Sequence, residues 1–218
     1  QNIEAMKIDA VVMRHPTPGA PLHLTKHIDA IVVNAGDGTH EHPTQAILDM
    51  TSLHEKFGYL KGLKVALIGD ISHSRVALSN IYGLKTMGAE VTLCGPSTLI
   101  PPYAEELGVS VNYNVDEVIE WADALNVLRI QRERMGGGLL PSVREYRNLF
   151  GITTERLAMH KKELVIMHPG PMNRGVEIDS SVADSDQAII LDQVLNGVAS
   201  RMAILYLLLG GKQEEGKD

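Results

Sequence analysis

Residues 36–45, with the sequence GDGTHEHPTQ, contain side chains that could bind an anionic ligand. They follow an apolar run typical of a buried strand and precede an amphipathic run typical of a helix. Pro43 suits the first turn of that helix, because proline lacks the N–H group that would have no partner there. His42 and Gln45 would then lie at a helix start, where free N–H groups and the helix dipole favour phosphate. An ordinary helix cap with an incidental histidine explains this segment equally well.

Arg14 follows a strand predicted at residues 9–13, and residues 36–45 follow a strand predicted at residues 30–34. In a parallel sheet, ligands collect at the carboxyl ends of the strands. Arg14 and His42 could therefore converge on one ligand although they are distant in sequence. A solvated surface charge is the alternative explanation for Arg14.

Two further arginines follow strands predicted at residues 65–68 and 124–128. Arg75 would lie on the first turn of the helix after the earlier strand. Gly69 has no second glycine two residues later, so the fingerprint of a dinucleotide-binding fold is absent. Arg129 and Gln131 would share one side of an extended segment and could face the same ligand. A solvated charge run is the alternative explanation for residues 129–134.

The sequence HPGP at residues 168–171 follows a strand predicted at residues 164–167. Two prolines around one glycine fix the backbone outside helix or sheet, so carbonyl groups in this turn could point at a ligand. The nine histidines of the chain show no HExxH motif. We therefore predict no metal site and no cofactor.

Strands alternate with helices along the chain, which is typical of βα units around a parallel sheet. We expect an α/β protein with two doubly wound parallel-sheet domains, joined by a bridging helix at residues 43–57 and by a long C-terminal helix. The predicted domains are residues 1–58 and 59–185. A helix at residues 186–211 would pack back on the first domain, and residues 212–218 would form a disordered tail.

The composition excludes several classes of protein. Of the 218 residues, 44% are hydrophobic and 22% charged, as in ordinary globular proteins, and the net charge of −7 argues against general nucleic-acid binding. The longest apolar run, at residues 203–209, is too short to span a membrane. The single cysteine, Cys94, excludes an internal disulfide and fits a cytoplasmic location.

The order and spacing of these clusters closely resemble those of aspartate carbamoyltransferase catalytic chains. The combination of the motifs HPTQ, RxQxER and HPxP is highly specific for this family. The resemblance extends from residue 1 to about residue 211. It implies the formation of N-carbamoyl-L-aspartate and phosphate from carbamoyl phosphate and L-aspartate, in pyrimidine biosynthesis. It also implies a homotrimer with shared active sites, which can associate with regulatory or dihydroorotase chains.

The resemblance assigns roles to matching residues of the first half and of the HPGP turn. Arg14 and His42 would donate hydrogen bonds to the carbonyl oxygen of carbamoyl phosphate, and Gln45 would hold its amide. The carbonyl groups of Gly170 and Pro171 would orient the carbamoyl amide and the attacking amine.

The resemblance places aspartate in the second domain. Arg75 and Arg129 would bind its two carboxylates, assisted by Gln131. Ornithine carbamoyltransferase is a less favoured alternative: it shares HPTQ, but it carries HCLP at the position of residues 168–171. Two arginines also suit an acceptor with two carboxylates better than they suit ornithine.

One departure from the family pattern concerns phosphate binding. The STRT segment of the family and the SxxK loop contributed by a neighbouring subunit would both lie before Gln1. The first domain is therefore expected to be incomplete in these 218 residues. A non-catalytic binding or assembly module remains the alternative function.

Overall fold

The computed structural model describes residues 5–130, 142–160 and 163–210. A two-stranded parallel sheet comes first, formed by β1 (Ala10–His15) and β2 (Ile31–Asp37). A five-stranded parallel sheet follows, in the order β5-β4-β3-β6-β7. Its strands are β3 (Lys64–Ile68), β4 (Glu90–Cys94), β5 (Ser110–Val111), β6 (Ala124–Val127) and β7 (Val165–Met167). The predicted α/β fold with two parallel sheets is confirmed.

Helices lie between and after the strands, and the one predicted at residues 43–57 has these bounds. The helices are α2 (Ala20–Leu24), α3 (Pro43–Phe57), α4 (Arg75–Thr86), α5 (Val115–Trp121), α6 (Val143–Phe150), α7 (Thr154–Met159), α8 (Ser180–Ala183) and α9 (Ile190–Gly210), with 3-10 turns at Ser97–Leu99 and Ala104–Leu107. The short helix α8 was not predicted. The predicted tail at residues 212–218 lies outside the described residues.

The last helix begins later than predicted, at Ile190 instead of residue 186. The backbone before it pairs with the edge of the sheet: the N–H of Ile166 donates to the carbonyl of Gln187, and the N–H of Ile189 donates to the carbonyl of Ile166, both at 2.9 Å. These bonds extend the sheet beyond β7 and keep residues 187–189 out of the helix.

The strand order determines where a ligand can bind. From β3 the chain moves outward through β4 to β5, then returns to the other side of β3 with β6 and β7. A crevice forms at such a reversal, beyond the carboxyl ends of the two central strands. Arg75 follows β3 and Arg129 follows β6, so both lie at the edge where this crevice is expected.

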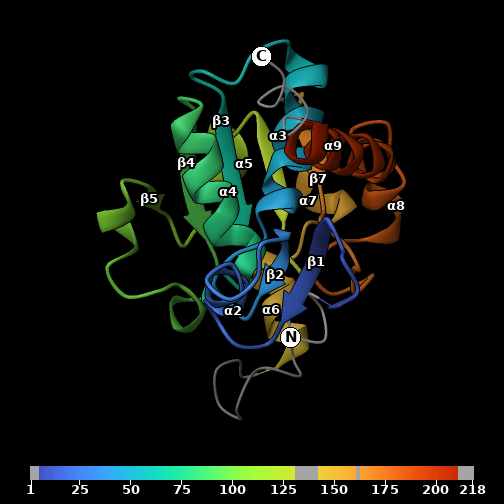
Figure 1. Cartoon of the computed structure of the whole chain (residues 1–218). Helices are drawn as coiled ribbons and strands as arrows, with labels where there is room; N and C mark the ends of the chain where they lie inside the picture. Colours follow the sequence, from blue (N-terminus) through green and yellow to red (C-terminus); the bar gives the residue numbers. More distant parts are fainter. Residues whose placement is uncertain (1–4, 131–141, 161–162, 211–218) are drawn as a thin grey trace.

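The core of the larger sheet follows the two-residue period of its strands. On β3, Val65 and Leu67 join the apolar cluster formed with α3 and α4, whereas Ala66 and Ile68 join the cluster formed with α5 and α6. All four side chains are fully buried. Helices thus cover both faces, and Figure 1 shows α4 across β3 and β4. Burial of each large aliphatic side chain contributes about 1.5–3 kcal/mol to folding.

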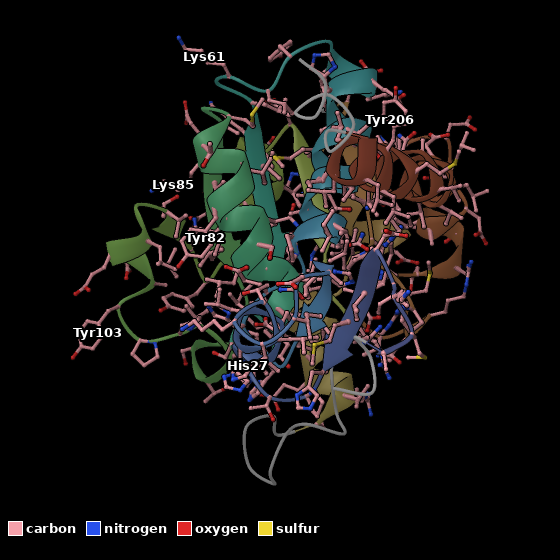
Figure 2. All side chains as sticks on the ribbon, viewed as in Figure 1. His27, Lys61, Tyr82, Lys85, Tyr103 and Tyr206 are labelled. Carbon is pink, nitrogen blue, oxygen red and sulfur yellow. The ribbon has the colours of Figure 1, made fainter. Side chains whose placement is uncertain are left out.

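Helix α9 lies beside α3 (Figure 1) and contacts it through buried polar residues, among them Gln193, Asn196 and Ser200. Its opposite face is apolar and exposed, and Figure 2 shows Tyr206 pointing outward. The apolar run at residues 203–209 is too short to span a membrane. The whole of α9, with 21 residues, is long and apolar enough to do so by length and composition alone. One such helix is weak evidence for a membrane span, because buried core helices of soluble proteins meet the same criteria.

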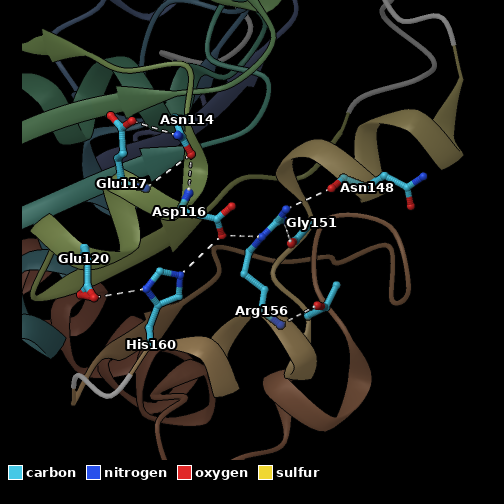
Figure 3. A network of polar contacts seen from close by, with 9 residues as sticks. Asn114, Asp116, Glu117, Glu120, Asn148, Gly151, Arg156 and His160 are labelled. Carbon is cyan, nitrogen blue, oxygen red and sulfur yellow. Dashed lines mark hydrogen bonds and ion pairs between the residues drawn. The ribbon is translucent and has the colours of Figure 1, made fainter.

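A polar network fastens α7 to α5 and to the end of α6 (Figure 3). Arg156 Nε lies 2.9 Å from Asp116 Oδ1, and its guanidinium also donates to the carbonyls of Asn148 and Gly151. His160 lies 3.5 Å from carboxylate oxygens of both Asp116 and Glu120. Because these carboxylates are largely exposed, each ion pair adds at most about 1 kcal/mol, and the network mainly fixes the orientation of α7.

Candidate active site

One pocket of about 460 Å³ brings together the residues that the sequence singles out. It opens between the two sheets and is lined by Arg14 from β1, His42 and Gln45 from the start of α3, Ser74, Arg75 and Val76 from the start of α4, Arg129 after β6, Pro169, Gly170 and Pro171 after β7, and Arg201 from α9. Seven of the eight predicted site residues line this pocket. The eighth, Gln131, lies outside the described residues.

The turn before α3 is held by a buried carboxylate. Asp37 accepts hydrogen bonds from the backbone N–H groups of Gly19 and Glu41, both at 2.9 Å. Burial opposes its ionisation, but these two N–H groups, with His40, lower the pKa of Asp37 below its ordinary value. The turn therefore holds His42 at the N-cap position, directly before α3.

The side chain of His42 does not cap α3. His42 occupies the N-cap position, but its side chain makes no capping hydrogen bond. Its backbone N–H donates to Ser79 Oγ at 2.8 Å, and its ring Nδ1 lies 3.4 Å from Thr44 Oγ1. His42 therefore does not cap the helix through its side chain, and the imidazole lines the pocket.

The surroundings keep His42 neutral. Burial, followed by the positive charges of Arg75, Arg14 and Arg201, lowers its pKa from 6.5 to about 4. A neutral ring whose Nδ1 accepts from Thr44 Oγ1, 3.4 Å away, would carry its proton on Nε2. His42 is therefore a neutral hydrogen-bond donor at physiological pH, suited to an oxygen that gains negative charge.

Gln45 presents an acceptor to the pocket. Its Nε2 donates to the buried Asp49 at 3.0 Å, which leaves the carbonyl oxygen of its side chain for a ligand. The backbone carbonyls of the Gly170–Pro171 turn are further acceptors. Acceptors of this kind suit a ligand with an NH₂ group.

Arg75 lies between the two sheets, which the sequence alone did not indicate. It is 7% exposed, and its Nη1 donates to the carbonyl of Gly38 at 3.3 Å. A Cβ atom on Gly36 would lie 2.7 Å from Arg75 Cζ, so the absence of a side chain at Gly36 makes room for the guanidinium. Arg75 consequently supports the turn before α3 as well as lining the pocket.

His168 supports the HPGP turn from behind. Its side chain is fully buried, with Nδ1 accepting from the backbone N–H of Gly170 at 2.9 Å and Nε2 3.4 Å from Glu177 Oε1. Its own backbone N–H donates to Gln193 Oε1 at 2.9 Å. The peptide bond between Gly170 and Pro171 is cis. Histidine in this turn is therefore structural and does not contact a ligand.

Arg201 is a pocket residue that the sequence analysis missed. It donates to the carbonyl of Gly197 at 2.8 Å, one turn earlier in α9. A Cβ atom on Gly197 would lie 2.6 Å from Arg201 Nη1, so the glycine leaves space for the guanidinium. A sequence signal existed, because Gln193, Gly197 and Arg201 follow one another at four-residue spacing and therefore share one face of the helix.

Arg14, Arg75, Arg129 and Arg201 together give the pocket a strong positive charge. None of its lining residues in the described part of the chain is acidic. No cluster of potential metal ligands occurs among these residues either. The pocket is therefore suited to small ligands that carry several negative charges.

The low pKa of His42 predicts a pH effect on stability. Folded His42 should titrate near pH 4, whereas in the unfolded chain it titrates near 6.5. Because the unfolded chain binds the proton more readily, this contribution to stability is complete above about pH 6.5 and is lost as the pH falls towards 4. NMR titration of the ring measures the pKa directly. His42→Gln should flatten the dependence of unfolding free energy on pH in this window, and a folded pKa near 6.5 would contradict the prediction.

Two domains of a known family match the sequence. The carbamoyl-P binding domain of aspartate/ornithine carbamoyltransferases matches residues 1–55. The Asp/Orn binding domain of the same family matches residues 61–208. Both sheets and every described lining residue of the pocket lie within these two matches.

Individual relatives agree with this result. The chain is 58% identical, over 98% of its length, to the aspartate carbamoyltransferase catalytic subunit of Gemmatimonas aurantiaca, and covers 67% of that protein. It is 61% identical to the catalytic subunit of Christiangramia forsetii over 95% of its length, covering 67% of that protein. The aspartate transcarbamoylase of Trypanosoma cruzi in complex with carbamoyl phosphate has a TM-score of 0.84 at 30% identity, over 94% of this chain and 67% of that one. The chain thus spans about two thirds of the length of these relatives, and it belongs to the aspartate/ornithine carbamoyltransferase family.

Proposed function

We propose that this chain transfers the carbamoyl group of carbamoyl phosphate to the amine of L-aspartate, giving N-carbamoyl-L-aspartate and phosphate. The observation that carries the proposal is the pocket in which four arginines surround a neutral histidine. Carbamoyl phosphate and aspartate both carry several negative charges, which the arginines would bind. Structures of the Trypanosoma cruzi enzyme contain carbamoyl phosphate with aspartate, or N-(phosphonacetyl)-L-aspartic acid. The relatives are catalytic subunits, which favours an enzyme over a non-catalytic module.

The carbamoyl side of the reaction belongs to the start of α3 and the turn after β7. Arg14 and the Nε2–H of His42 would donate to the carbonyl oxygen, which becomes an oxyanion in the tetrahedral intermediate. The side-chain oxygen of Gln45 and the carbonyls of Gly170 and Pro171 would accept from the carbamoyl NH₂. These contacts fix the plane of the carbamoyl group and expose its carbon to attack.

The aspartate side belongs to Arg75 and Arg129, with Gln131 assigned to the same ligand by the family pattern. Holding both carboxylates would direct the amine towards the carbamoyl carbon. As the new C–N bond forms and the bond to the phosphate oxygen breaks, the leaving phosphate can take the amine proton. We assign no protein group as general base and no covalent nucleophile. The thiol of Cys94 is buried away from the pocket, and burial raises its pKa to about 12.

The arginines of the pocket predict which acceptor is used. Carbamoyl transfer to L-aspartate should exceed transfer to L-ornithine by at least about a hundredfold, because the pocket repels the second amine of ornithine and leaves an arginine without its carboxylate. Radiolabelled carbamoyl phosphate with each amino acid in turn measures the two rates. Comparable rates with ornithine would overturn the choice of acceptor, and no product with either would overturn the proposed function.

The domain organisation and the assembly belong to this proposal. The family matches at residues 1–55 and 61–208 support domains that meet at the end of α3. We also propose that the protein is a cytoplasmic homotrimer with shared active sites, and that regulatory or dihydroorotase chains can associate with it. The reaction would belong to pyrimidine biosynthesis. Sedimentation at several protein concentrations tests the trimer.

A further inference from the structure

A buried carboxylate lies directly behind the pocket. Asp49, on α3, is 0% exposed and accepts hydrogen bonds from four side-chain amides. Its Oδ1 accepts from Gln45 at 3.0 Å and Gln193 at 2.8 Å, and its Oδ2 accepts from Asn80 at 2.8 Å and Asn126 at 3.3 Å. None of these four partners is charged, which is unusual for a buried acid.

The hydrogen bonds fix the orientation of each amide. An ionised carboxylate only accepts hydrogen bonds, and four amide donors fill the acceptor positions of Asp49. Burial raises the pKa of Asp49, and the four amide donors oppose this effect. Because the NH₂ group of Gln45 must face Asp49, its carbonyl oxygen faces the pocket.

The other three partners belong to elements that carry pocket residues. Gln193 also accepts from the backbone N–H of His168, which precedes the Pro169–Pro171 turn. Asn80 lies on α4 and donates to the carbonyl of Val76, a lining residue. Asn126 lies on β6, just before Arg129. One carboxylate thus connects α3, α4, β6 and α9, and each of these elements carries or directly precedes lining residues of the pocket.

We propose that Asp49 is a positioning residue for carbamoyl transfer: it orients Gln45 so that the amide oxygen, and not the amide nitrogen, faces the carbamoyl NH₂. This inference rests on the proposed function. A reversed Gln45 would direct an N–H group at the NH₂ of the ligand and would lose the contact that fixes the carbamoyl plane. Asp49 therefore acts on the reaction through Gln45 without touching the substrate.

The chain provides a matched control for mere helix packing. Ser52, one turn further along α3, is also buried, and it accepts from Asn196 of α9 at 3.1 Å. It joins the same two helices as the contact between Asp49 and Gln193, but no lining residue of the pocket depends on it. Ser52→Ala removes a comparable polar contact between α3 and α9 and leaves Gln45 in place.

The first experiment compares the kinetics of Asp49→Asn and Ser52→Ala. Asparagine keeps the shape of Asp49 but places an NH₂ group against the amide donors. Asp49→Asn should lower kcat roughly tenfold to hundredfold, with the KM for aspartate changed by less than about threefold, whereas Ser52→Ala should leave kcat within about twofold. In a chain that already carries Gln45→Ala, adding Asp49→Asn should cost much less. An equal loss of kcat in Asp49→Asn and Ser52→Ala, or full additivity with Gln45→Ala, would overturn the proposal.

The second experiment does not depend on activity or on a folded variant. In the unaltered chain, the NH₂ protons of Gln45 should exchange with solvent far more slowly than those of the exposed Asn148, as measured by NMR. Exchange of Gln45 at the rate of Asn148 would show that Asp49 does not hold it and would overturn the inference. If the unaltered chain transfers no carbamoyl group, the proposed function fails, whereas slow exchange of Gln45 would remain the result expected of a side chain held by Asp49.

Discussion

Replacing His42 with alanine should reduce turnover roughly a hundredfold or more, while changing the affinity for aspartate little. The reason is the neutral Nε2–H donor, which would contact the carbonyl oxygen most strongly when that oxygen carries negative charge. A donor of this kind stabilises the transition state more than the bound substrate, so its loss appears in kcat. Arg14 is the other proposed donor to this oxygen, and it would retain part of the activity.

His40 provides a matched control within the same turn. Its side chain is 51% exposed and lies 3.5 Å from Asp37 Oδ2, outside the pocket. His40→Ala should therefore keep turnover within about threefold, because the buried Asp37 keeps its two backbone N–H donors when it loses the half-exposed His40. Steady-state kinetics at saturating carbamoyl phosphate separates kcat from the KM for aspartate. Near-normal turnover in His42→Ala would assign His42 a purely structural role.

The elements with clear local signals could be predicted from the sequence. The bounds of α3 were predicted correctly because Pro43 starts the helix and Gly58, with φ of 79°, ends it. Local signals also mark β4, which is an apolar run, and α5, which Asn114 caps. The convergence of Arg14 and His42 followed from two parallel strands that end at one edge, whereas the resemblance to the family assigned Gln45 and Arg129 to the same site.

The features that were not predicted depend on distant contacts. The hydrogen bonds of Asp49 join residues that are far apart in sequence, such as Gln193, and an aspartate in an amphipathic helix shows no local sign of burial. The contact of Arg75 with Gly36 and Gly38 crosses between the two sheets. Residues 187–189 have helical propensity, but pairing with the edge of β7 outweighs it.

Replacing Arg129 with alanine should weaken aspartate binding roughly a hundredfold, while changing carbamoyl phosphate binding by less than about threefold. Loss of one charged, bidentate partner costs a few kcal/mol, but only for the ligand that it contacts. Arg129 follows β6 of the larger sheet, whereas Arg14, His42 and Gln45 belong to the β1–β2 sheet and the start of α3. Arg75 gives a less specific test, because its contact with Gly38 also supports the turn before His42.

Equilibrium titration measures the affinity of Arg129→Ala for aspartate and for carbamoyl phosphate separately. N-(phosphonacetyl)-L-aspartic acid serves as a third ligand that probes both sides of the pocket. Arg174 provides the control, since it pairs with Asp184 at 2.8 Å on the surface of the same half of the chain, and Arg174→Ala should leave both affinities unchanged. Affinity for the combined probe should fall about as much as affinity for aspartate, because only the dicarboxylate part loses its partner. Equal weakening of aspartate and carbamoyl phosphate would instead place Arg129 on the phosphate or in the support of the fold. The division of the pocket between the two sheets would then be wrong, even if carbamoyl transfer itself were measured.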